Sequence, residues 1–189
     1  MSNESALANV LDLMKRLEIE LAMLYSNLAG ITHDPAINLV MRKISIESAA
    51  HSYILTMIKQ LVRECPPRRV MDAEYLVSMQ GKIEESLRHI DEIRGLVSSK
   101  GKVDEEAIIS FIVNELSGLE GFESSATQVY SFLLRSYLPI TSTRANPRCR
   151  TVSKLIVRLL KGISDDEKSH GELLRVLGEL LGRERIKKG

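Results

Sequence analysis

Apolar residues recur at alternating steps of three and four through most of the sequence. This spacing puts side chains on one face of an α-helix. The pattern is interrupted at Gly30, at the Pro66-Pro67 pair, at Gly101 and at Pro139. Alternation of β-branched residues is scarce, and neither Asn-Gly nor Asp-Gly, the usual pairs of tight hairpins, occurs. The pattern predicts an all-α protein.

Five helices are predicted, over residues 4–28, 35–65, 72–98, 104–138 and 147–182. Asp34-Pro35 and Asn146-Pro147 each place a capping side chain before a proline at the first helical position, which favours a helix start. The residues after 182 are expected to fray. No linker or low-complexity segment divides the chain, so we expect a single domain over residues 1–189.

One inward stripe runs along each predicted helix except the third, and each stripe is apolar except near its middle. There every stripe carries a glutamate, and a histidine follows in two of them: Glu18, Glu47 with His51, Glu123, and Glu167 with His170. In the second helix the predicted stripe is Ile37, Val40, Ile44, Glu47, His51, Ile54, Ile58 and Leu61. Four helices are therefore expected to bring a carboxylate to the same level of the interior.

Such a set of carboxylates needs counter-charges. A buried carboxylate costs several kcal/mol unless it is neutralised or paired. Two divalent cations would balance four carboxylates, and two neutral imidazoles would complete an oxygen and nitrogen ligand set that suits iron or manganese. The alternative for any single glutamate is an edge position from which it reaches water. The coincidence over four helices favours the metal site.

Neighbouring acidic residues are assigned by their angle around the helix. Glu20 lies about 200° from Glu18 and is expected to face water. Glu120 is one turn before Glu123 and is the second-choice or additional ligand. Two acidic residues of the last helix fall outside its stripe: Asp166 and Glu172.

The sequence also contains an internal repeat. The first and fourth helices each carry Glu-x6-Tyr, ending at Tyr25 and Tyr130, and the second and fifth each carry a glutamate followed by a histidine. Two similar hairpins around a pseudo-twofold axis would explain this. Buried tyrosine hydroxyls need hydrogen-bond partners. The carboxylates of the opposite hairpin are candidates, and the tyrosines would then hold these metal ligands in position by hydrogen bonds. Filling of the core is the alternative role for both tyrosines.

The arrangement E…ExxH…E…ExxH over four helices resembles the ferritin-like superfamily, and within it the rubrerythrin-like proteins. The segment "DEKSHGELL" is similar to the motif of their last helix. The resemblance implies a ferritin-like four-helix bundle in up-down-down-up order, with residues 72–98 as an additional crossover helix. The chain departs from the pattern at Glu47-x-x-x-His51, where one more residue separates the pair.

The same resemblance implies two metal ions, with iron expected and manganese or zinc as alternatives, and redox chemistry with peroxide or dioxygen. Glu18 and Glu123 would be terminal or bridging carboxylates, and the two glutamate–histidine pairs the remaining ligands. There is no rubredoxin segment, so the electron donor would be an external partner. A non-catalytic helical module whose polar Glu/His core serves assembly or partner binding stays open, as do an iron-storage cage and a homo-oligomer.

In this topology Cys65 and Cys149 would be neighbours at one end of the bundle. A disulfide there is not expected in a cytosolic protein unless the source is a hyperthermophile. The same end collects arginines that form a solvated charged end or, alternatively, a site for an anion or a partner: Arg63, Arg68, Arg69, Arg144, Arg148 and Arg150.

Composition narrows the function classes. Apolar residues make up 44% of the chain, charged residues 27%, and the formal net charge is +1. This balance gives no overall field that would attract nucleic acid or an anionic membrane. No apolar run could span a bilayer and the first residues lack the features of a signal peptide, so a cytoplasmic location is expected. Two distant cysteines are too few for a thiolate zinc or iron–sulfur site.

Overall fold

The computed structural model describes residues 3–66, 73–99, 105–137 and 146–188. These residues form five helices and no strand, which confirms the all-α prediction: α1 (Asn3–Gly30), α2 (Pro35–Glu64), α3 (Ala73–Ser99), α4 (Glu105–Tyr137) and α5 (Pro147–Lys188). The expected fraying after residue 182 is wrong, because α5 continues to Lys188 through residues that favour the helix and include no proline.

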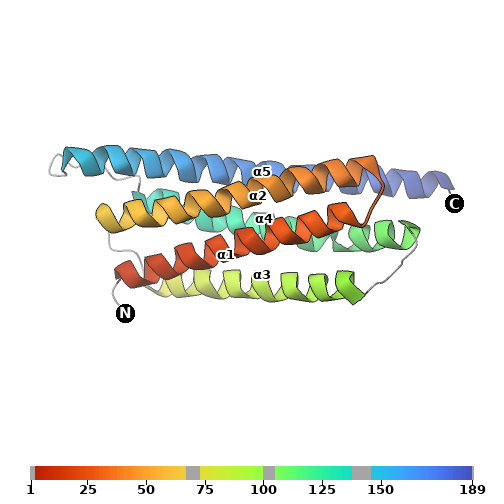
Figure 1. Cartoon of the computed structure of the whole chain (residues 1–189), viewed down its shortest axis with the longest axis horizontal. Coiled ribbons are helices and arrows are strands. Elements are labelled where there is room, and N and C mark those ends of the chain that lie inside the picture. The colour runs from red at the N-terminus through yellow and green to blue at the C-terminus, as the bar shows by residue number, and fades with distance from the viewer. Residues whose placement is uncertain (1–2, 67–72, 100–104, 138–145, 189) are drawn as a thin grey trace.

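The helices lie side by side along the long axis of the molecule (Figure 1). Helices α1, α3 and α5 run in one direction, and α2 and α4 run in the other. Helix α1 packs on α2, α2 on α5 and α5 on α4, while α3 packs on both α1 and α4. Without α3, the remaining four helices have up-down-down-up order.

The two helix starts predicted from a capping residue followed by proline are confirmed. The side chain of Asp34 accepts hydrogen bonds at 2.9 Å from the backbone N–H groups of Ala36 and Ile37, with Pro35 in the first turn. Asn146 Oδ1 accepts a bond of 2.9 Å from the backbone N–H of Arg148. These caps satisfy N–H groups that the helix cannot pair internally.

The inward stripe of α2 differs from its prediction. The buried residues of this helix are Ile37, Met41, Ile44, Ser48, His51, Leu55, Ile58 and Val62. A stripe with steps of three and four residues can begin with either step, and the two choices place different residues on the inward face. In α2 both sets of positions are rich in apolar residues, so the sequence pattern could not distinguish them and the prediction used the wrong one. As a result Ser48 faces the interior, and Glu47, expected there, lies on the flank.

Helix α3 covers the side of the bundle between α1 and α4 with an apolar face that includes Ile83 and Ile90. Its Arg94 forms an ion pair with Glu20 of α1, whose side chain is only 18% exposed. The prediction that Glu20 faces water is therefore wrong, because α3 shields that flank. On the α4 side, the ring of His89 packs edge-on against Phe122, with centroids 5.1 Å apart.

A disulfide joins Cys65, at the end of α2, to Cys149, in the first turn of α5, with Cα atoms 5.3 Å apart. The cysteines are neighbours as predicted, and the disulfide, which the sequence left open, is formed. Beside the bond, Arg148 pairs with Glu64 at 2.7 Å. Of the arginines assigned to this end, Arg68, Arg69 and Arg144 lie outside the described residues, and the other three are exposed.

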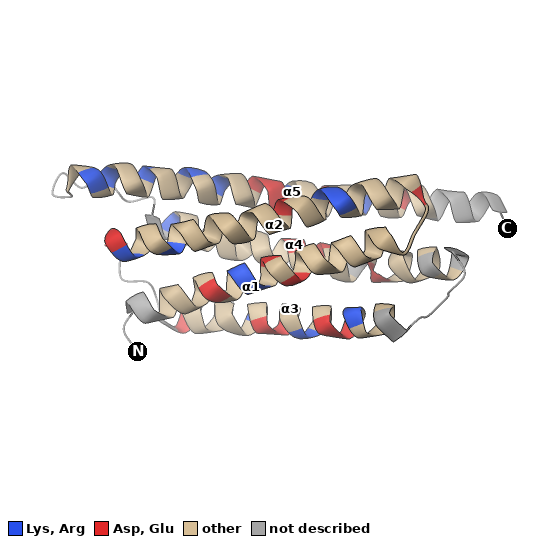
Figure 2. Ribbon diagram, in the orientation of Figure 1, with Lys and Arg blue, Asp and Glu red and all other residues tan. Residues whose placement is uncertain are grey.

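Figure 2 shows acidic residues near mid-length of α1 and α5, and lysines and arginines spread over several helices. Within the part of the chain that the structure describes, no helix has an apolar stretch long enough to cross a membrane.

Removing the disulfide is expected to lower the free energy of unfolding by about 2–4 kcal/mol, because the bond joins residues 84 apart and restricts the unfolded chain. Urea unfolding of a Cys65→Ser, Cys149→Ser double variant, followed by circular dichroism, measures the loss. Dithiothreitol should move the wild-type midpoint to that of the variant and leave the variant unchanged. Equal midpoints for the two proteins without reductant would contradict the prediction.

Candidate metal centre

Five acidic and histidine side chains lie in the largely apolar interior, each at most 2% exposed: Glu18, His51, Glu123, Glu167 and His170. They come from α1, α2, α4 and α5, as the stripes predict, and apolar layers pack on either side of them. Their backbone positions are fixed by the helices and not by loops, so the carboxylates cannot swing out to water without opening the core.

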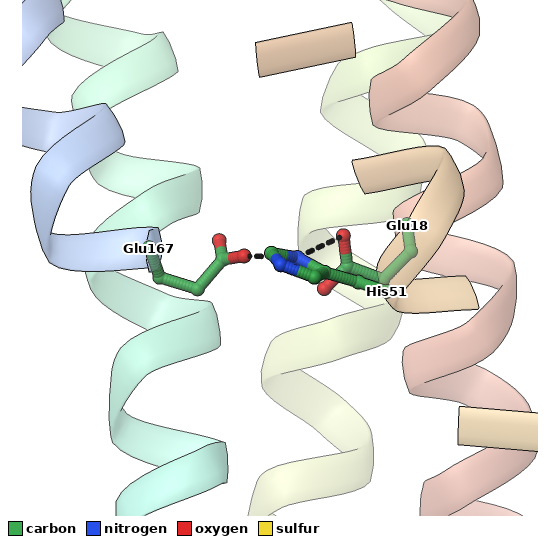
Figure 3. A group of neighbouring side chains, drawn as sticks. All are labelled: Glu18, His51 and Glu167. Carbon is green, nitrogen blue, oxygen red and sulfur yellow. Dashed lines mark ion pairs between the residues drawn. The ribbon is translucent and has the colours of Figure 1, made fainter. Parts of the chain in front are cut away.

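The first group is Glu18, His51 and Glu167 (Figure 3). His51 Nδ1 lies 2.8 Å from Glu167 Oε1 and 3.6 Å from Glu18 Oε2. None of these contacts has hydrogen-bond geometry, and His51 Nδ1, Glu18 Oε2 and both carboxylate oxygens of Glu167 are buried with no hydrogen-bond partner. Buried polar atoms are rarely left in this state, so these atoms have the arrangement of a ligand set for a cation.

The second group is Glu123, Glu167 and His170. His170 Nδ1 lies 3.3 Å from Glu123 Oε2 and 3.9 Å from Glu167 Oε1. Glu167 belongs to both groups and stands between them. In each group the three donor atoms lie within 4.8 Å of one another, close to the separation of about 4.4 Å for opposite ligands at 2.0–2.2 Å from one ion. The residues present therefore fit a pair of metal ions that share Glu167.

The two tyrosines cross the interior between α1 and α4. Tyr25 donates a hydrogen bond of 2.6 Å to Glu123 Oε1, and Tyr130 donates one of 2.5 Å to Glu18 Oε1. The predicted partners, carboxylates of the opposite hairpin, are confirmed. Each hydroxyl holds one oxygen of its carboxylate and leaves the other oxygen facing the histidine groups.

Each histidine also reaches a carboxylate nearer the surface through its second nitrogen. His170 Nε2 lies 2.7 Å from Glu47 Oε2, and His51 Nε2 lies 3.2 Å from Asp166 Oδ2. The side chains of Glu47 and Asp166 are 33% and 51% exposed. A carboxylate on the outer nitrogen fixes the orientation of the ring and makes the inner nitrogen a better ligand.

The predicted residues thus divide into two sets. Five of the six ligands proposed from the sequence meet in the interior, and the sixth, Glu47, does not join either group because its side of α2 faces outward. Glu120 also lies outside both groups, and is half-buried. The role of Asp166 was not predicted because this residue lies off the stripe of α5, yet its carboxylate contacts His51 of α2. The matching spacing of Glu47 to His51 and of Asp166 to His170 is the signal that could have identified it.

A surface hollow of about 320 Å³ lies between α4 and α5, beside the centre. Glu123 and Glu167 form part of its wall, and Lys168 stands among its other residues: Glu120, Ser124, Thr127 and Gly171. The carboxylate oxygens of Glu167 are buried behind this wall, so a small polar molecule in the hollow lies next to the centre without touching them.

The pKa values of the buried side chains are shifted by burial and by the charged groups packed around them. Burial and then the neighbouring carboxylates raise the pKa values of Tyr25 and Tyr130 well above the usual 10.0, so both remain hydrogen-bond donors. Burial lowers the pKa of His51, but the contacts with Glu18 and Asp166 outweigh it and the net shift is upward. Burial raises the pKa of Glu123, but contact with His170 reverses the shift. Without a metal, protons therefore supply the positive charge of the cluster.

Comparison of the chain with protein-family models, with curated proteins and with solved structures gave no match.

Replacing Glu167 by glutamine is expected to stabilise the metal-free protein at neutral pH. Burial, and then the charges of Glu18 and Glu123, raise the pKa of folded Glu167 well above its usual 4.5. The folded chain keeps a proton that the unfolded chain releases, so the free energy of unfolding of the wild type falls as the pH rises above 4.5. Glu167→Gln removes this fall, and its advantage should grow with pH.

Thermal melts in the presence of a chelator, between about pH 4 and about pH 8, test this expectation. Glu172→Gln, on an exposed position of the same helix, is the control and should follow the wild type throughout. A wild type that stays more stable than Glu167→Gln over the whole range would show that burial does not oppose the charge of Glu167.

Proposed function

We propose that this chain is a ferritin-like di-metal carboxylate protein that carries out redox chemistry with dioxygen or peroxide. The observation that carries the proposal is the set of unpartnered buried donor atoms on Glu18, His51 and Glu167, next to a second group that shares Glu167. The order of the four long helices, with α3 as a crossover between α2 and α4, supports the ferritin-like part of the proposal.

In this proposal Glu18, His51 and Glu167 hold one ion, and Glu123, His170 and Glu167 hold the other. Carboxylates and imidazoles form a mixed ligand set that suits iron, with manganese and zinc as alternatives. When bound, a pair of ferrous or manganous ions would supply the electrons and the Lewis acidity needed to reduce dioxygen or peroxide, whereas zinc would supply Lewis acidity alone. The chain fixes the ligands and keeps bulk water from them.

Other residues of the chain have supporting roles. The hydroxyls of Tyr25 and Tyr130 hold the carboxylates of Glu123 and Glu18 in place. The hollow beside Lys168 would hold a small polar molecule next to the buried carboxylates of the centre. An external electron donor belongs to the same proposal.

A non-catalytic helical module, used for assembly or partner binding, is the second candidate function. The observation in its favour is that several polar contacts of the cluster are complete without a metal, including those from Tyr25 to Glu123 and from His170 to Glu47. This candidate requires a melting temperature that neither chelator nor added metal changes. A cytoplasmic location fits either candidate only in a cell that keeps the Cys65–Cys149 disulfide oxidised.

Metal binding is expected to reach two divalent ions per chain, one for each group. Glu18→Ala and Glu123→Ala should each lose one ion, because each removes a ligand of one group. Glu167→Ala should weaken both, since both groups use this residue. Equilibrium dialysis with Fe²⁺ under anaerobic conditions, followed by elemental analysis, measures the stoichiometry.

Glu120→Ala is the matched control: it removes a carboxylate beside Glu123 that belongs to neither group, and should keep both ions. Fewer than one ion per wild-type chain, with the same value for Glu167→Ala, would eliminate the di-metal function and favour the non-catalytic module.

Oxidation of the Fe²⁺-loaded protein by hydrogen peroxide, followed optically, tests the redox part of the proposal. The wild type should react at least about tenfold faster than the same concentration of Fe²⁺ with the Glu167→Ala variant, because only an ordered pair of ions is preorganised for the reaction. A wild-type rate no greater than that of the variant would leave a metal-binding protein without this chemistry.

A further inference from the structure

Helices α2 and α5 are repeats of each other around the centre. Residues 44–51 read ISIESAAH and residues 163–170 read ISDDEKSH, so both segments share the Ile-Ser start, an acidic residue at the fourth position and the final histidine. With the two histidines aligned, every buried position of α2 coincides with a buried position of α5, from Ile37 with Ile156 to Val62 with Leu181.

In this alignment Ser48 of α2 is the counterpart of Glu167 of α5. Ser48 is fully buried, and its hydroxyl oxygen has no hydrogen-bond partner. Its neighbours on the same helix behave differently: the hydroxyl of Ser45 donates to Ala22 O at 2.8 Å, and that of Ser52 donates to Ala49 O at 2.7 Å. The hydroxyls of Ser45 and Ser52 thus both reach a backbone carbonyl, that of Ser45 on α1 and that of Ser52 within α2. Ser48 therefore keeps a free donor on the face where the other half of the protein places a carboxylate.

The centre also has one negative charge too few to balance two divalent ions. Within the described residues, three carboxylates are fully buried: Glu18, Glu123 and Glu167. Glu47, which could supply a fourth charge, lies on the flank, where it contacts the outer nitrogen of His170 and its charge is paired with Lys43 at 2.5 Å. Two divalent ions would bring four positive charges against three, and an unbalanced charge in an apolar interior is costly. One monoanion beside Ser48 would restore the balance.

We propose that Ser48 marks a binding site for one small monoanionic carboxylate, which takes the place of the fourth carboxylate that the repeat lacks. The Ser48 hydroxyl donates a hydrogen bond to one of its oxygens, and the ligand lies opposite Glu167 with respect to the pseudo-twofold axis. The site rests on the proposed di-metal function and specifies its ligand class: a small carboxylate that binds the loaded centre without displacing a protein ligand.

Formate binding to the Co²⁺-loaded protein tests the proposal, because the visible absorption of Co²⁺ reports changes in its ligands. The wild type, loaded with two Co²⁺, should show a saturable spectral change that fits one formate per chain. Ser48→Glu supplies its own carboxylate, so it should keep two Co²⁺ and lose the response to formate. Ser48→Ala should bind formate at least about tenfold more weakly, since a buried hydrogen bond to a charged ligand is lost.

Ser52→Glu is the matched control, because it adds the same charge one turn further along α2 at a partly exposed position, and it should respond like the wild type. Should Ser48→Glu fail to fold by circular dichroism, Ser48→Gln fills the same space without charge and should also lose the response.

The outcomes separate this proposal from the function on which it rests. A wild type that does not load two Co²⁺ overturns both. A wild type that loads two Co²⁺ but gives no spectral change with formate overturns the formate site alone, as does a Ser48→Glu or Ser48→Gln variant that responds like the wild type.

Discussion

Repulsion among buried carboxylates is the constraint on which the centre of this protein depends. Glu167 is fully buried and shares the interior with Glu18 and Glu123, which lie on facing helices. Tyr25 and Tyr130 each hold one oxygen of Glu123 and Glu18, so those carboxylates are partly satisfied within the chain. Both oxygens of Glu167 have no such partner. A proton or a cation must supply the counter-charge, and a pair of cations does so for all three carboxylates at once.

The rest of the fold keeps the carboxylates at one level. Leucine and isoleucine layers above and below the polar residues bury enough apolar surface to oppose the cost of the charges. Helix α3 closes the side between α1 and α4, where its Arg94 neutralises Glu20 outside the core. Two acidic residues of α1 thus have different roles: Glu18 faces the centre, and Glu20 forms an ion pair that holds α3 against α1.

Much of the fold follows from local chemistry that a sequence displays. Proline and capping residues mark the starts of α2 and α5, and most residues of the stripes predicted for α1, α4 and α5 are buried. Helix α1 also buries a second row that the stripe omits, Val10, Leu17 and Leu24, because α1 packs on both α2 and α3. Helix α2 is apolar in two phases, and only its packing against α1 and α5 selects the one that buries Ser48 and turns Glu47 outward. The contact of Asp166 with His51 depends on how two distant helices meet, which no single helix pattern contains. Oxidation of Cys65 and Cys149 depends on the cell as well as on their proximity.

The disulfide has a mechanical consequence for the centre. It ties α2 to α5 at one end, and these are the two helices that carry His51 and His170. Sliding of one helix along the other by a turn would separate each histidine from its carboxylates, and the covalent tie opposes that axial slip. The motion that remains is a splaying of the far ends about Cys65 as a pivot. Widening of the centre would therefore begin at the end remote from the disulfide, where the turn between α1 and α2 lies.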